Sequence, residues 1–246
     1  TAPHLARCCS AGEPLNPEVI EEWEKFCGLK IREGYGQTET VIVAASWDEI
    51  EVRPGSMGKA APGFDLQVVD PEGRIVHPGE EGEIAIRVNP ERPLGLFREY
   101  WQAPERMAES FRGDWYYTGD RAVRDEDGYF WFLSRSDDVI ITSGYRIGPF
   151  EVESALIEHD AVAESAVVSS PDRTRGEVVK AFVVLARGYE PSEKLRQELQ
   201  NHVKAVTAPF KYPRRIEFVE SLPKTISGKI RRVELRAAEW AEGPPD

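Results

Sequence analysis

The sequence predicts a protein of mixed α/β and α+β class in two parts, and three observations support this prediction. Near the start, a bounded helix pattern leads into a short apolar strand and a glycine-punctuated loop, which is typical of α/β folds. From about residue 63, short β-rich runs alternate with turns such as PEG, PGEEG and DEDG. After the polar stretch SRSDD, strand and helix patterns mix again, which predicts a compact α+β unit.

The first predicted element is a helix that begins after Asn16. Asn is a favourable N-cap, and Pro17 suits the first helical position. Gly28 provides the stop. Apolar side chains at helical spacing are expected on one face: Val19, Ile20, Trp23, Phe26 and Cys27. A strand over residues 29–32 then runs into the loop GYGQTET.

A β-rich subdomain is predicted from about residue 63 onward. Its strands are expected in the runs LQVVD, GEIAIRV, DWYYTGDRAV and GYFWFLSR, joined as hairpins. The aromatic side chains of these runs are most simply explained as core residues and cross-strand pairs: Trp115, Tyr116, Tyr117, Tyr129, Phe130, Trp131 and Phe132.

The remainder of the chain predicts a separate small unit. Strands are expected over residues 139–142, 165–169, 178–185 and 215–220, and helices over residues 149–158 and 192–206 and from about residue 231. The charged stretch around Asp137 has the composition of an interdomain linker. We therefore expect two domains, residues 1–136 and residues 137–246.

Composition and charge exclude several classes of function. The 246 residues carry a net charge of −12, which argues against nucleic acid as a main partner. Cys8, Cys9 and Cys27 form no metal set and are interpreted as buried thiols. No apolar run is long enough for a membrane span, and no signal peptide stands at the start, so the cytoplasm is the expected location. Organellar targeting from an upstream segment stays open, because the opening TAPHLARCCSAGEP looks like the interior of a longer protein.

The loop GYGQTET, residues 34–40, is a candidate for phosphate and magnesium chemistry. Its glycines allow a tight turn and a close approach to a ligand. Tyr35 offers a flat face for stacking, Thr38 a hydroxyl, and Glu39 a hard oxygen of the kind that Mg²⁺ prefers. A polar turn between a strand and a helix would explain the same residues.

The motif YTGD, residues 117–120, places a carboxylate beside a Thr-Gly turn. Asp120 suits a bidentate hydrogen bond to a ribose diol. The DEDG turn that follows predicts a hairpin, which would return the chain and bring Arg135 beside Asp120. A structural salt bridge between these two side chains is the alternative.

Two glycine-containing motifs stand in the C-terminal part. In SDDVIITSGYRIG, Gly144 and Gly148 indicate either a backbone-lined binding surface or the start of a β-hairpin. In LPKTISGKIRR, Gly228 makes the loop thin enough for Lys229 to reach into a cleft, where an ammonium suits a carboxylate or phosphate oxygen. A solvated basic run at the surface is the alternative. The pair GK is not a P-loop, because no glycine stands five residues before it and no strand leads directly into it. The two arginines after this loop are expected to be surface charge: Arg231 and Arg232.

Together and in this order, SAGEP, GYGQTET, YTGD, SRSDDVIITSGYRIGPFEVE and PKTISGK resemble the adenylate-forming superfamily, which includes acyl-CoA synthetases, luciferases and the adenylation domains of peptide synthetases. The stretches SSPDRTRGEVVKAFVVL and TAPFKYPRRIEFVESLPKTISGKI look most like medium-chain acyl-CoA synthetases. The resemblance covers essentially the whole chain. It implies that residues 1–136 are the C-terminal part of a large AMP-binding domain and that residues 137–246 are a small mobile α+β domain.

The resemblance implies a ligase that works in two half-reactions. A carboxylic acid first attacks the α-phosphate of Mg-ATP, which gives acyl-AMP and pyrophosphate. The small domain then rotates, and the thiol of CoA displaces AMP to form the thioester. The implied cofactors are ATP or AMP, Mg²⁺ and CoA, and the implied substrate is a medium-chain carboxylic acid.

Site roles follow from the resemblance, position by position. Catalytic roles fall on Thr38 at the α-phosphate, Glu39 on Mg²⁺ and Lys229 between the acyl carboxylate and the α-phosphate. Nucleotide contacts are implied for Gly12, Glu13, Pro14, Tyr35, Asp120 and Arg135. CoA contacts are implied for Gly144, Tyr145, Arg146, Arg173, Lys204 and Tyr212. Asp137 would be the hinge between the domains.

One part of the family pattern has no counterpart in this sequence. The Ser/Thr/Gly-rich loop that ends in Lys and cradles the ATP phosphates is absent, as is most of the acyl pocket. The chain therefore resembles the C-terminal half or less of such an enzyme and is expected to be inactive alone. The alternatives are a non-catalytic nucleotide- or CoA-binding fragment, a luciferase-like oxygenase, or a carrier-protein loader. A smaller departure is Ser134, where many relatives have Gly before the arginine.

Overall fold

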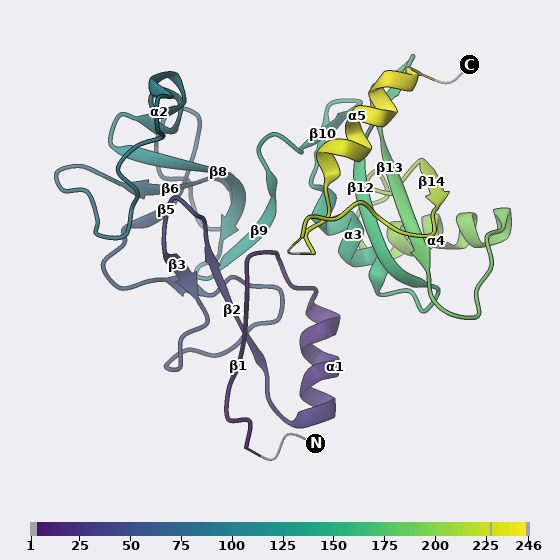
Figure 1. Cartoon of the computed structure of the whole chain (residues 1–246), viewed down its shortest axis with the longest axis horizontal. Helices are drawn as coiled ribbons and strands as arrows, with labels where there is room; N and C mark the ends of the chain where they lie inside the picture. Colours follow the sequence, from purple (N-terminus) through teal and green to yellow (C-terminus); the bar gives the residue numbers. More distant parts are fainter. Residues whose placement is uncertain (1–3, 227, 245–246) are drawn as a thin grey trace. The chain divides into compact units, whose positions relative to one another are not determined.

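The computed structural model describes residues 4–226 and 228–244 of the chain. Its contacts divide it into two compact units, residues 1–136 and residues 137–246. Figure 1 traces the helices and strands of both units along the chain. No helix in the described ranges is long and apolar enough to cross a membrane.

The N-terminal unit begins with a four-stranded sheet of order β1-β2-β3-β4. Its strands are β1 (Cys8–Ala11), β2 (Ile31–Gly36), β3 (Ile42–Ala45) and β4 (Lys59–Ala60). β1 and β2 are parallel and are joined by helix α1 (Pro17–Cys27), whereas the other pairs are antiparallel. This βαβ start confirms the α/β class predicted for the beginning of the chain.

β2 is longer than the strand predicted over residues 29–32, because the glycines of GYG continue it. Gly36 pairs with Ile42, and a Cβ atom on Gly36 would lie 2.2 Å from the carbonyl oxygen of Val41. Only glycine allows β2 and β3 to approach so closely at this point. The turn of the GYGQTET motif therefore begins only after its glycines.

α1 has the predicted boundaries but only part of the predicted apolar face. The Asn16 side chain accepts a hydrogen bond from the backbone N–H of Glu18 at 2.8 Å, and Gly28 closes the helix at a φ of 75°. The inward stripe holds three of the expected side chains: Ile20, Trp23 and Cys27. The other two lie seven residues apart on an adjacent exposed face: Val19 and Phe26.

The three thiols are not buried as predicted, and none is in a disulfide. Cys9 is exposed, and Cys8 and Cys27 are half-buried. Cys8 and Cys9 lie on β1, where half-buried and exposed residues alternate, so one face of that strand meets solvent.

The second sheet of this unit is the predicted β-rich subdomain. Its order is β5-β6-β8-β7, with β9 paired to β8. The strands are β5 (Leu66–Val69), β6 (Glu81–Arg87), β7 (Phe111–Arg112), β8 (Trp115–Arg124) and β9 (Phe130–Arg135), and their pairings are antiparallel. The ends of the four longer strands lie within two residues of the predicted runs.

Five of the seven aromatic side chains predicted for the core of this subdomain are buried: Trp115, Tyr116, Tyr117, Tyr129 and Phe130. Trp131 and Phe132 on β9 are half-buried. Helix α2 (Pro104–Ser110) escaped prediction, because it is only seven residues long and its N-cap, Ala103, makes no side-chain hydrogen bond.

The C-terminal unit is an α+β fold around a three-stranded sheet of order β12-β13-β14. β12 (Val162–Asp172) and β13 (Gly176–Leu185) are antiparallel, and β14 (Arg215–Phe218) is parallel to β13. The helices are α3 (Pro149–Ile157), α4 (Glu193–Val206) and α5 (Arg232–Glu242). A hairpin of β10 (Ile140–Thr142) and β11 (Tyr145–Ile147) precedes α3.

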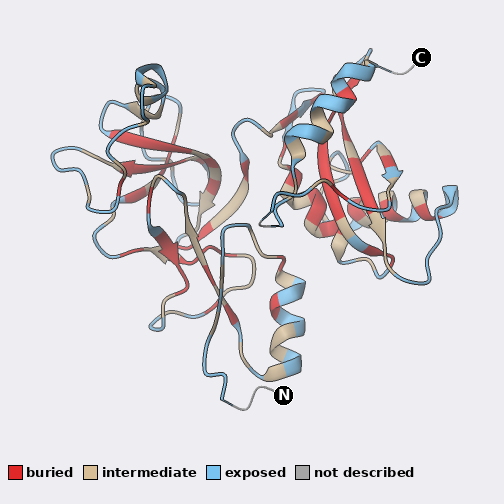
Figure 2. Cartoon of the chain, in the orientation of Figure 1, coloured by how far each residue is buried: buried red, intermediate tan, exposed pale blue. Residues whose placement is uncertain are grey.

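The sheet of the C-terminal unit is buried on both faces (Figure 2). One face packs with α3 and α4 in a cluster that includes Val167 and Leu199. The other face packs with α5 in a smaller cluster that includes Val168 and Phe182. Successive side chains of a strand point to opposite faces, so the long apolar run of β12 supplies both clusters.

Glu33 on β2 is a carboxyl group buried near the start of α1. It is 8% exposed, and its Oε1 accepts a hydrogen bond from the backbone N–H of Leu15 at 3.0 Å. Its Oε2 is buried without a hydrogen-bond partner among the described residues. Burial raises the pKa of Glu33 to about 7, because one hydrogen bond does not offset the loss of water.

Replacing Glu33 by Gln should stabilise this chain above neutral pH. A raised pKa favours the neutral carboxyl in the folded state, so its stabilising contribution is present below a pH of about 4 and is lost as the pH rises to about 7. Urea unfolding measures the effect: Glu33→Gln should gain roughly 1–3 kcal/mol of unfolding free energy at about pH 8 and little at about pH 4. The exposed Glu21→Gln is the control. A gain for Glu33→Gln that does not depend on pH would contradict this account.

Candidate functional site

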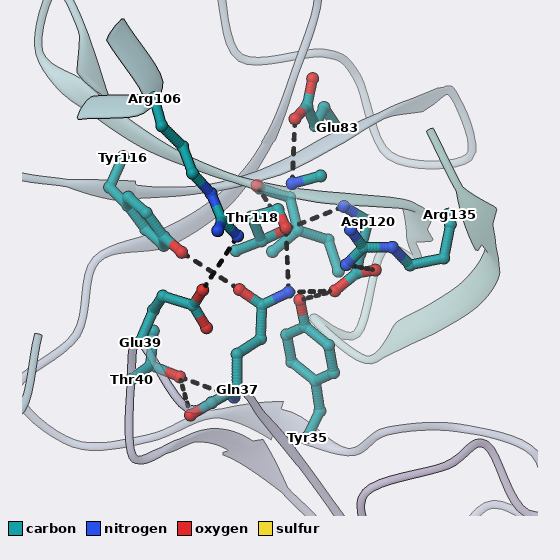
Figure 3. Close-up of polar contacts among 12 residues, drawn as sticks. Tyr35, Gln37, Glu39, Thr40, Glu83, Arg106, Tyr116, Thr118, Asp120 and Arg135 are labelled. Atoms are coloured by element: carbon teal, nitrogen blue, oxygen red, sulfur yellow. Dashed lines mark hydrogen bonds and ion pairs between the residues drawn. The ribbon is translucent and has the colours of Figure 1, made fainter. Parts of the chain in front are cut away.

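The candidate site of the N-terminal unit centres on Asp120, a buried carboxylate in β8 (Figure 3). The pairing of β6 with β8 shifts register between Glu83 and Ala85, so the TGD stretch bulges from the sheet. Gly119 has a positive φ of 76° in this bulge, and its N–H donates to Glu83 Oε1 at 3.1 Å. The bulge thereby sets where the Asp120 side chain points.

Three side chains donate to the Asp120 carboxylate. Arg135 Nη1 lies 3.0 Å from Oδ1, as the hairpin argument predicted, because Asp120 and Arg135 are register partners in β8 and β9. The Tyr35 hydroxyl and the Gln37 side-chain amide both donate to Oδ2, at 2.6 Å and 2.7 Å. Oδ2 therefore already accepts two hydrogen bonds, which uses its lone-pair sites.

Gln37 was not singled out from the sequence, although it stands inside GYGQTET. Its amide nitrogen also donates to the Thr118 carbonyl at 2.9 Å, and its Oε1 accepts from the Tyr116 hydroxyl at 3.2 Å. Gln37 thus joins the turn after β2 to β8, which belong to different sheets (Figure 3). Only an amide side chain both donates and accepts in this way, and that chemistry was the available sequence clue.

Burial dominates the electrostatics around Asp120. It raises the pKa of Asp120, although the Arg135 charge and the hydrogen bonds oppose it. Burial and the neighbouring Asp120 charge raise the pKa of Tyr35, so the phenol keeps its proton and remains a donor. The pair formed with Arg135 is a salt bridge, and the Arg135 side chain is 47% exposed. The Arg135 end of this hydrogen-bonded cluster therefore meets solvent, where a ligand could approach.

Thr38 and Glu39 follow in the turn after β2. Thr38 is exposed. Glu39 Oε1 accepts a hydrogen bond from the Tyr100 hydroxyl at 2.9 Å and lies 3.7 Å from Arg106 Nη2. Neither Tyr100 nor Arg106 belongs to a motif that the sequence analysis identified, and both are far from Glu39 along the chain, so no local pattern indicates this contact.

Gly12, Glu13 and Pro14 follow β1 at the carboxyl end of the parallel strand pair. Ala11 is the register partner of Gly34, so the SAGEP and GYGQTET motifs leave the sheet side by side. In open α/β sheets this edge is where ligands bind. The structure therefore gathers the SAGEP, GYGQTET and YTGD motifs in the N-terminal unit around one end of its first sheet and Asp120.

The glycine-bracketed motif of the C-terminal unit forms a β-hairpin, so the hairpin alternative is correct for its backbone. Ser143 and Gly144 both have positive φ, 50° and 84°, as a type I′ turn requires. Tyr145 and Arg146 are exposed. The Tyr145 ring stacks on Phe210, with ring centroids 4.2 Å apart and an interplanar angle of 19°.

Cations and aromatic rings meet along the segment after α4. Lys204 Nζ lies 4.1 Å from the centroid of the Tyr212 ring, and Arg214 Nη1 donates to the Tyr212 hydroxyl at 2.9 Å. Phe210, which carries the Tyr145 ring, belongs to the same segment. Three of the residues predicted to bind CoA therefore border this segment: Tyr145, Lys204 and Tyr212. Arg173 is exposed elsewhere, in the turn between β12 and β13.

Lys229 lies in a tight turn between Lys224 and Ile230, which pair antiparallel. The Thr225 N–H donates to the Lys229 carbonyl at 2.8 Å, and the Lys229 N–H donates to the Thr225 hydroxyl at 3.0 Å. Gly228 supports the turn with a φ of 88°. We call residues 224–230 the lysine loop; its Ser227 lies outside the described residues.

Arg232 is not surface charge, contrary to the prediction. It begins α5, which packs on β12, and its guanidinium donates to both carboxylate oxygens of Glu153, at 2.9 Å and 2.7 Å. The contact joins residues too distant along the chain for any sequence pattern to indicate it. Arg231 does lie at the surface, 2.5 Å from the Glu234 carboxylate.

Asp137, the predicted hinge, is the first residue of the C-terminal unit. Its carbonyl accepts a hydrogen bond from Arg236 Nη1 at 3.0 Å, and Oδ1 of the neighbouring Asp138 lies 2.5 Å from the same nitrogen. The start of this unit is therefore tied to α5.

Two family models match the chain. The model described as AMP-binding enzyme matches residues 1–101, and the model described as AMP-binding enzyme C-terminal domain matches residues 151–229. The SAGEP and GYGQTET motifs lie within the first match, and Lys229 is the last residue of the second.

Curated relatives match almost the whole chain. Acyl-coenzyme A synthetase ACSM3, mitochondrial, from Rattus norvegicus is 60% identical over 238 residues, which are 96% of this chain and 41% of that protein. Acyl-coenzyme A synthetase ACSM4, mitochondrial, from Homo sapiens is 60% identical over 239 residues, again 96% and 41%. The chain thus spans about two fifths of the length of these relatives.

Solved structures are similar over nearly the same range. The anthranilate CoA ligase AuaEII in complex with anthranoyl-AMP is 40% identical, with a TM-score of 0.86 over 96% of this chain and 45% of its own. ATP-bound MatB from Rhodopseudomonas palustris is 32% identical, with a TM-score of 0.87 over 96% and 46%. These similarities confirm the predicted fold class and the resemblance to the adenylate-forming superfamily.

Replacing Tyr35 by Phe should destabilise this chain by roughly 1–3 kcal/mol, because it removes one donor from a buried carboxylate and keeps the ring. Tyr100→Phe is the matched control, since it also removes a hydroxyl that donates to a carboxylate, but the Glu39 side chain is 21% exposed and that of Asp120 only 6%. Urea unfolding at neutral pH compares the two variants. Equal losses would show that the burial of Asp120 does not matter.

Proposed function

The chain belongs to the AMP-binding enzyme family, and we propose that its parent protein is an AMP-forming acyl-CoA synthetase for medium-chain carboxylic acids. The observation that carries the proposal is the 60% identity to acyl-coenzyme A synthetases over 96% of the chain. The geometry around Asp120 and the lysine loop supports it, because it provides polar groups of the types that such a reaction needs.

In the proposed complex, Asp120 and Arg135 bind the ribose of the nucleotide. Because Oδ2 of Asp120 already accepts from Tyr35 and Gln37, a ribose hydroxyl would donate to Oδ1. In place of the bidentate contact expected from the sequence, one ribose hydroxyl would then bond Asp120. The exposed guanidinium of Arg135 would donate a hydrogen bond to the other ribose hydroxyl. The adenine would pack on the Tyr35 ring, and the remaining nucleotide contacts would come from Gly12, Glu13 and Pro14.

The proposed first half-reaction brings two anions together. A carboxylate oxygen of the acid attacks the α-phosphorus, a P–O bond forms, and the bond to the β-phosphate oxygen breaks to release pyrophosphate. Lys229 would lie between the carboxylate and the α-phosphate, where its charge lowers their repulsion and aligns the attack. The exposed Thr38 hydroxyl would donate to the α-phosphate.

Glu39 is the residue proposed to hold Mg²⁺. No group of three or more His, Cys, Asp or Glu in the described ranges could hold a metal ion. Mg²⁺ is nevertheless commonly held by one or two carboxylates together with substrate phosphates, so a single, partly exposed carboxylate fits it. When bound, the ion would neutralise phosphate charge.

In the proposed second half-reaction, the sulfur of CoA bonds to the acyl carbonyl carbon, the C–O bond to AMP breaks, and the thiol proton leaves to solvent. Cationic side chains would pair with the phosphates of CoA, and Tyr145 and Tyr212 would contact its base. The proposed cations are Arg146, Arg173 and Lys204. Gly144 would allow a close approach of the β10–β11 turn, and Asp137 would be the hinge about which the small unit rotates between steps.

The isolated chain is proposed to be inactive, since it spans only 41% of the length of the relatives. The alternative function for the chain itself is nucleotide or CoA binding without catalysis. For the parent protein we propose a mitochondrial location in place of the cytoplasm, because the relatives are named mitochondrial.

The test of the proposed function uses the full-length parent protein with ATP, Mg²⁺, CoA and a series of carboxylic acids of increasing chain length. Thioester and AMP should form in equal amounts, with the highest rate at medium chain length. Pyrophosphate exchange that leads to no CoA product would instead indicate another adenylating enzyme, such as a carrier-protein loader. Pyrophosphate release by the isolated chain would contradict its proposed inactivity.

In the full-length protein, Lys229→Ala should slow acyl-AMP formation by about 10²–10³-fold, because it removes the cation proposed to lie between two reacting anions. Formation of the thioester from preformed acyl-AMP should change much less. Lys194→Ala is the matched control, because it also removes one lysine charge from the C-terminal unit but lies exposed on α4, outside the lysine loop. Equal loss in both half-reactions would refute the role of Lys229.

A further inference from the structure

The ion pair between Arg232 and Glu153 forms two residues after the end of the lysine loop. Glu153 is 4% exposed, and the guanidinium holds both of its carboxylate oxygens. The Arg232 side chain is 23% exposed, so the pair is largely withdrawn from water. A two-point contact of this kind restricts both distance and orientation, which a single contact does not.

The Glu153 carboxylate is itself fixed to the core of the unit. Its Oε1 also accepts from the backbone N–H of Val167 at 2.8 Å, and the Ser165 hydroxyl donates to the Glu153 carbonyl at 3.2 Å. Both contacts come from β12, the strand on which α3 and α5 pack. Arg232 is therefore held by a group that has little freedom to move.

The lysine loop is short, and both of its arms are attached to the same core. On the first arm, Leu222 is buried and Lys224 pairs with Glu164 of β12 at 2.6 Å. On the second arm, the Arg231 N–H donates to the Pro223 carbonyl at 2.9 Å. Arg232 follows at once, three residues after Lys229.

The other side-chain contact at the first turn of α5 is a weaker one. Its N-cap, Arg231, makes no capping hydrogen bond, and the ion pair of Arg231 with Glu234 lies at the surface, where such a pair contributes little. A cation in the first turn is also disfavoured by the helix dipole. The position of Arg232 is therefore explained by its buried partner rather than by helix propensity.

We propose that Arg232 is a positioning residue for Lys229: its ion pair with Glu153 fixes the second arm of the lysine loop to α3 and β12. The proposal rests on the role proposed above for Lys229. Without the pair, the first turn of α5 loosens, and the lysine spends less time at the point where acid and α-phosphate meet. Adenylation depends on that placement, whereas attack of CoA on preformed acyl-AMP does not.

The test compares Arg232→Met with Arg231→Met in the full-length protein. The second change is the matched control, because the neighbouring Arg231 pairs with Glu234 at the surface. Arg232→Met should slow acyl-AMP formation by about 10-fold or more and leave thioester formation from preformed acyl-AMP within about twofold. Arg231→Met should change neither rate by more than about twofold. Equal losses in both half-reactions, or no loss in either, would overturn the proposal.

Arg232→Met leaves a buried charge without its partner and could fail to fold. The double change Glu153→Gln with Arg232→Met removes that charge and still leaves an acceptor for the Val167 N–H. It should fold, as judged by thermal unfolding, and show the same selective loss of adenylation. If the folded double variant adenylates at the wild-type rate, the ion pair has no positioning role.

Hydrogen exchange separates this proposal from the proposed function. In this chain, the amides of Thr225, Gly228 and Lys229 are hydrogen-bonded within the lysine loop. They should exchange about 10-fold faster in the double variant than in the wild type, and no faster in Arg231→Met. If the wild-type parent forms no acyl-AMP, the proposed function fails while exchange still decides whether Arg232 holds the loop. Unchanged exchange would overturn the proposal whatever the activity of the parent.

Discussion

The hydrogen-bonded carboxylate of Asp120 is the contact on which the N-terminal site depends. An ionised carboxylate taken out of water costs several kcal/mol unless donors replace its hydration. Here the donors come from two separate segments, since Tyr35 and Gln37 belong to the GYGQTET motif and Arg135 to β9. The charge is stable only when these segments meet, so packing of the two sheets and assembly of the site are the same event.

The C-terminal unit repeats this principle with a different carboxylate. Glu153 is buried on α3 and is satisfied by Arg232 and by the backbone of β12. Asp120 lies at a proposed ligand site, whereas Glu153 binds the arginine that follows the lysine loop. In both units a buried acid binds an arginine that lies later in the sequence. The contact fixes the segment that carries the arginine, which is the end of β9 in one unit and the start of α5 in the other.

The sequence was informative where function or structure depends on neighbours along the chain. The DEDG turn was enough to bring β9 back beside β8. The bulge between Arg121 and Ala122 shifts the register by one residue, so that Arg135 rather than Ser134 faces Asp120, and no local sequence pattern indicates that bulge. The sequence was uninformative where the partner is distant. Nothing near Arg232 indicates Glu153, and nothing near Glu39 indicates Tyr100, so the first appeared to be surface charge and the second contact went unnoticed. Short elements such as β4 and α2 escaped for another reason, since they lack both periodicity and caps.

Tyr35 connects these physical constraints to the proposed recognition of nucleotide. Its protonated hydroxyl donates to Asp120 Oδ2 at 2.6 Å. Because the hydroxyl is rigidly attached to the ring, this hydrogen bond sets the distance between the Tyr35 ring and the Asp120 carboxylate. If the ring carries adenine and Oδ1 accepts a ribose hydroxyl, one side chain defines the spacing between the base and sugar contacts. Gln37 prevents the carboxylate from rotating away, because it bonds both Oδ2 and the Thr118 carbonyl. A nucleoside would then be selected by the distance between its base and its diol, and a purine and its ribose would be recognised as a unit rather than as two separate groups.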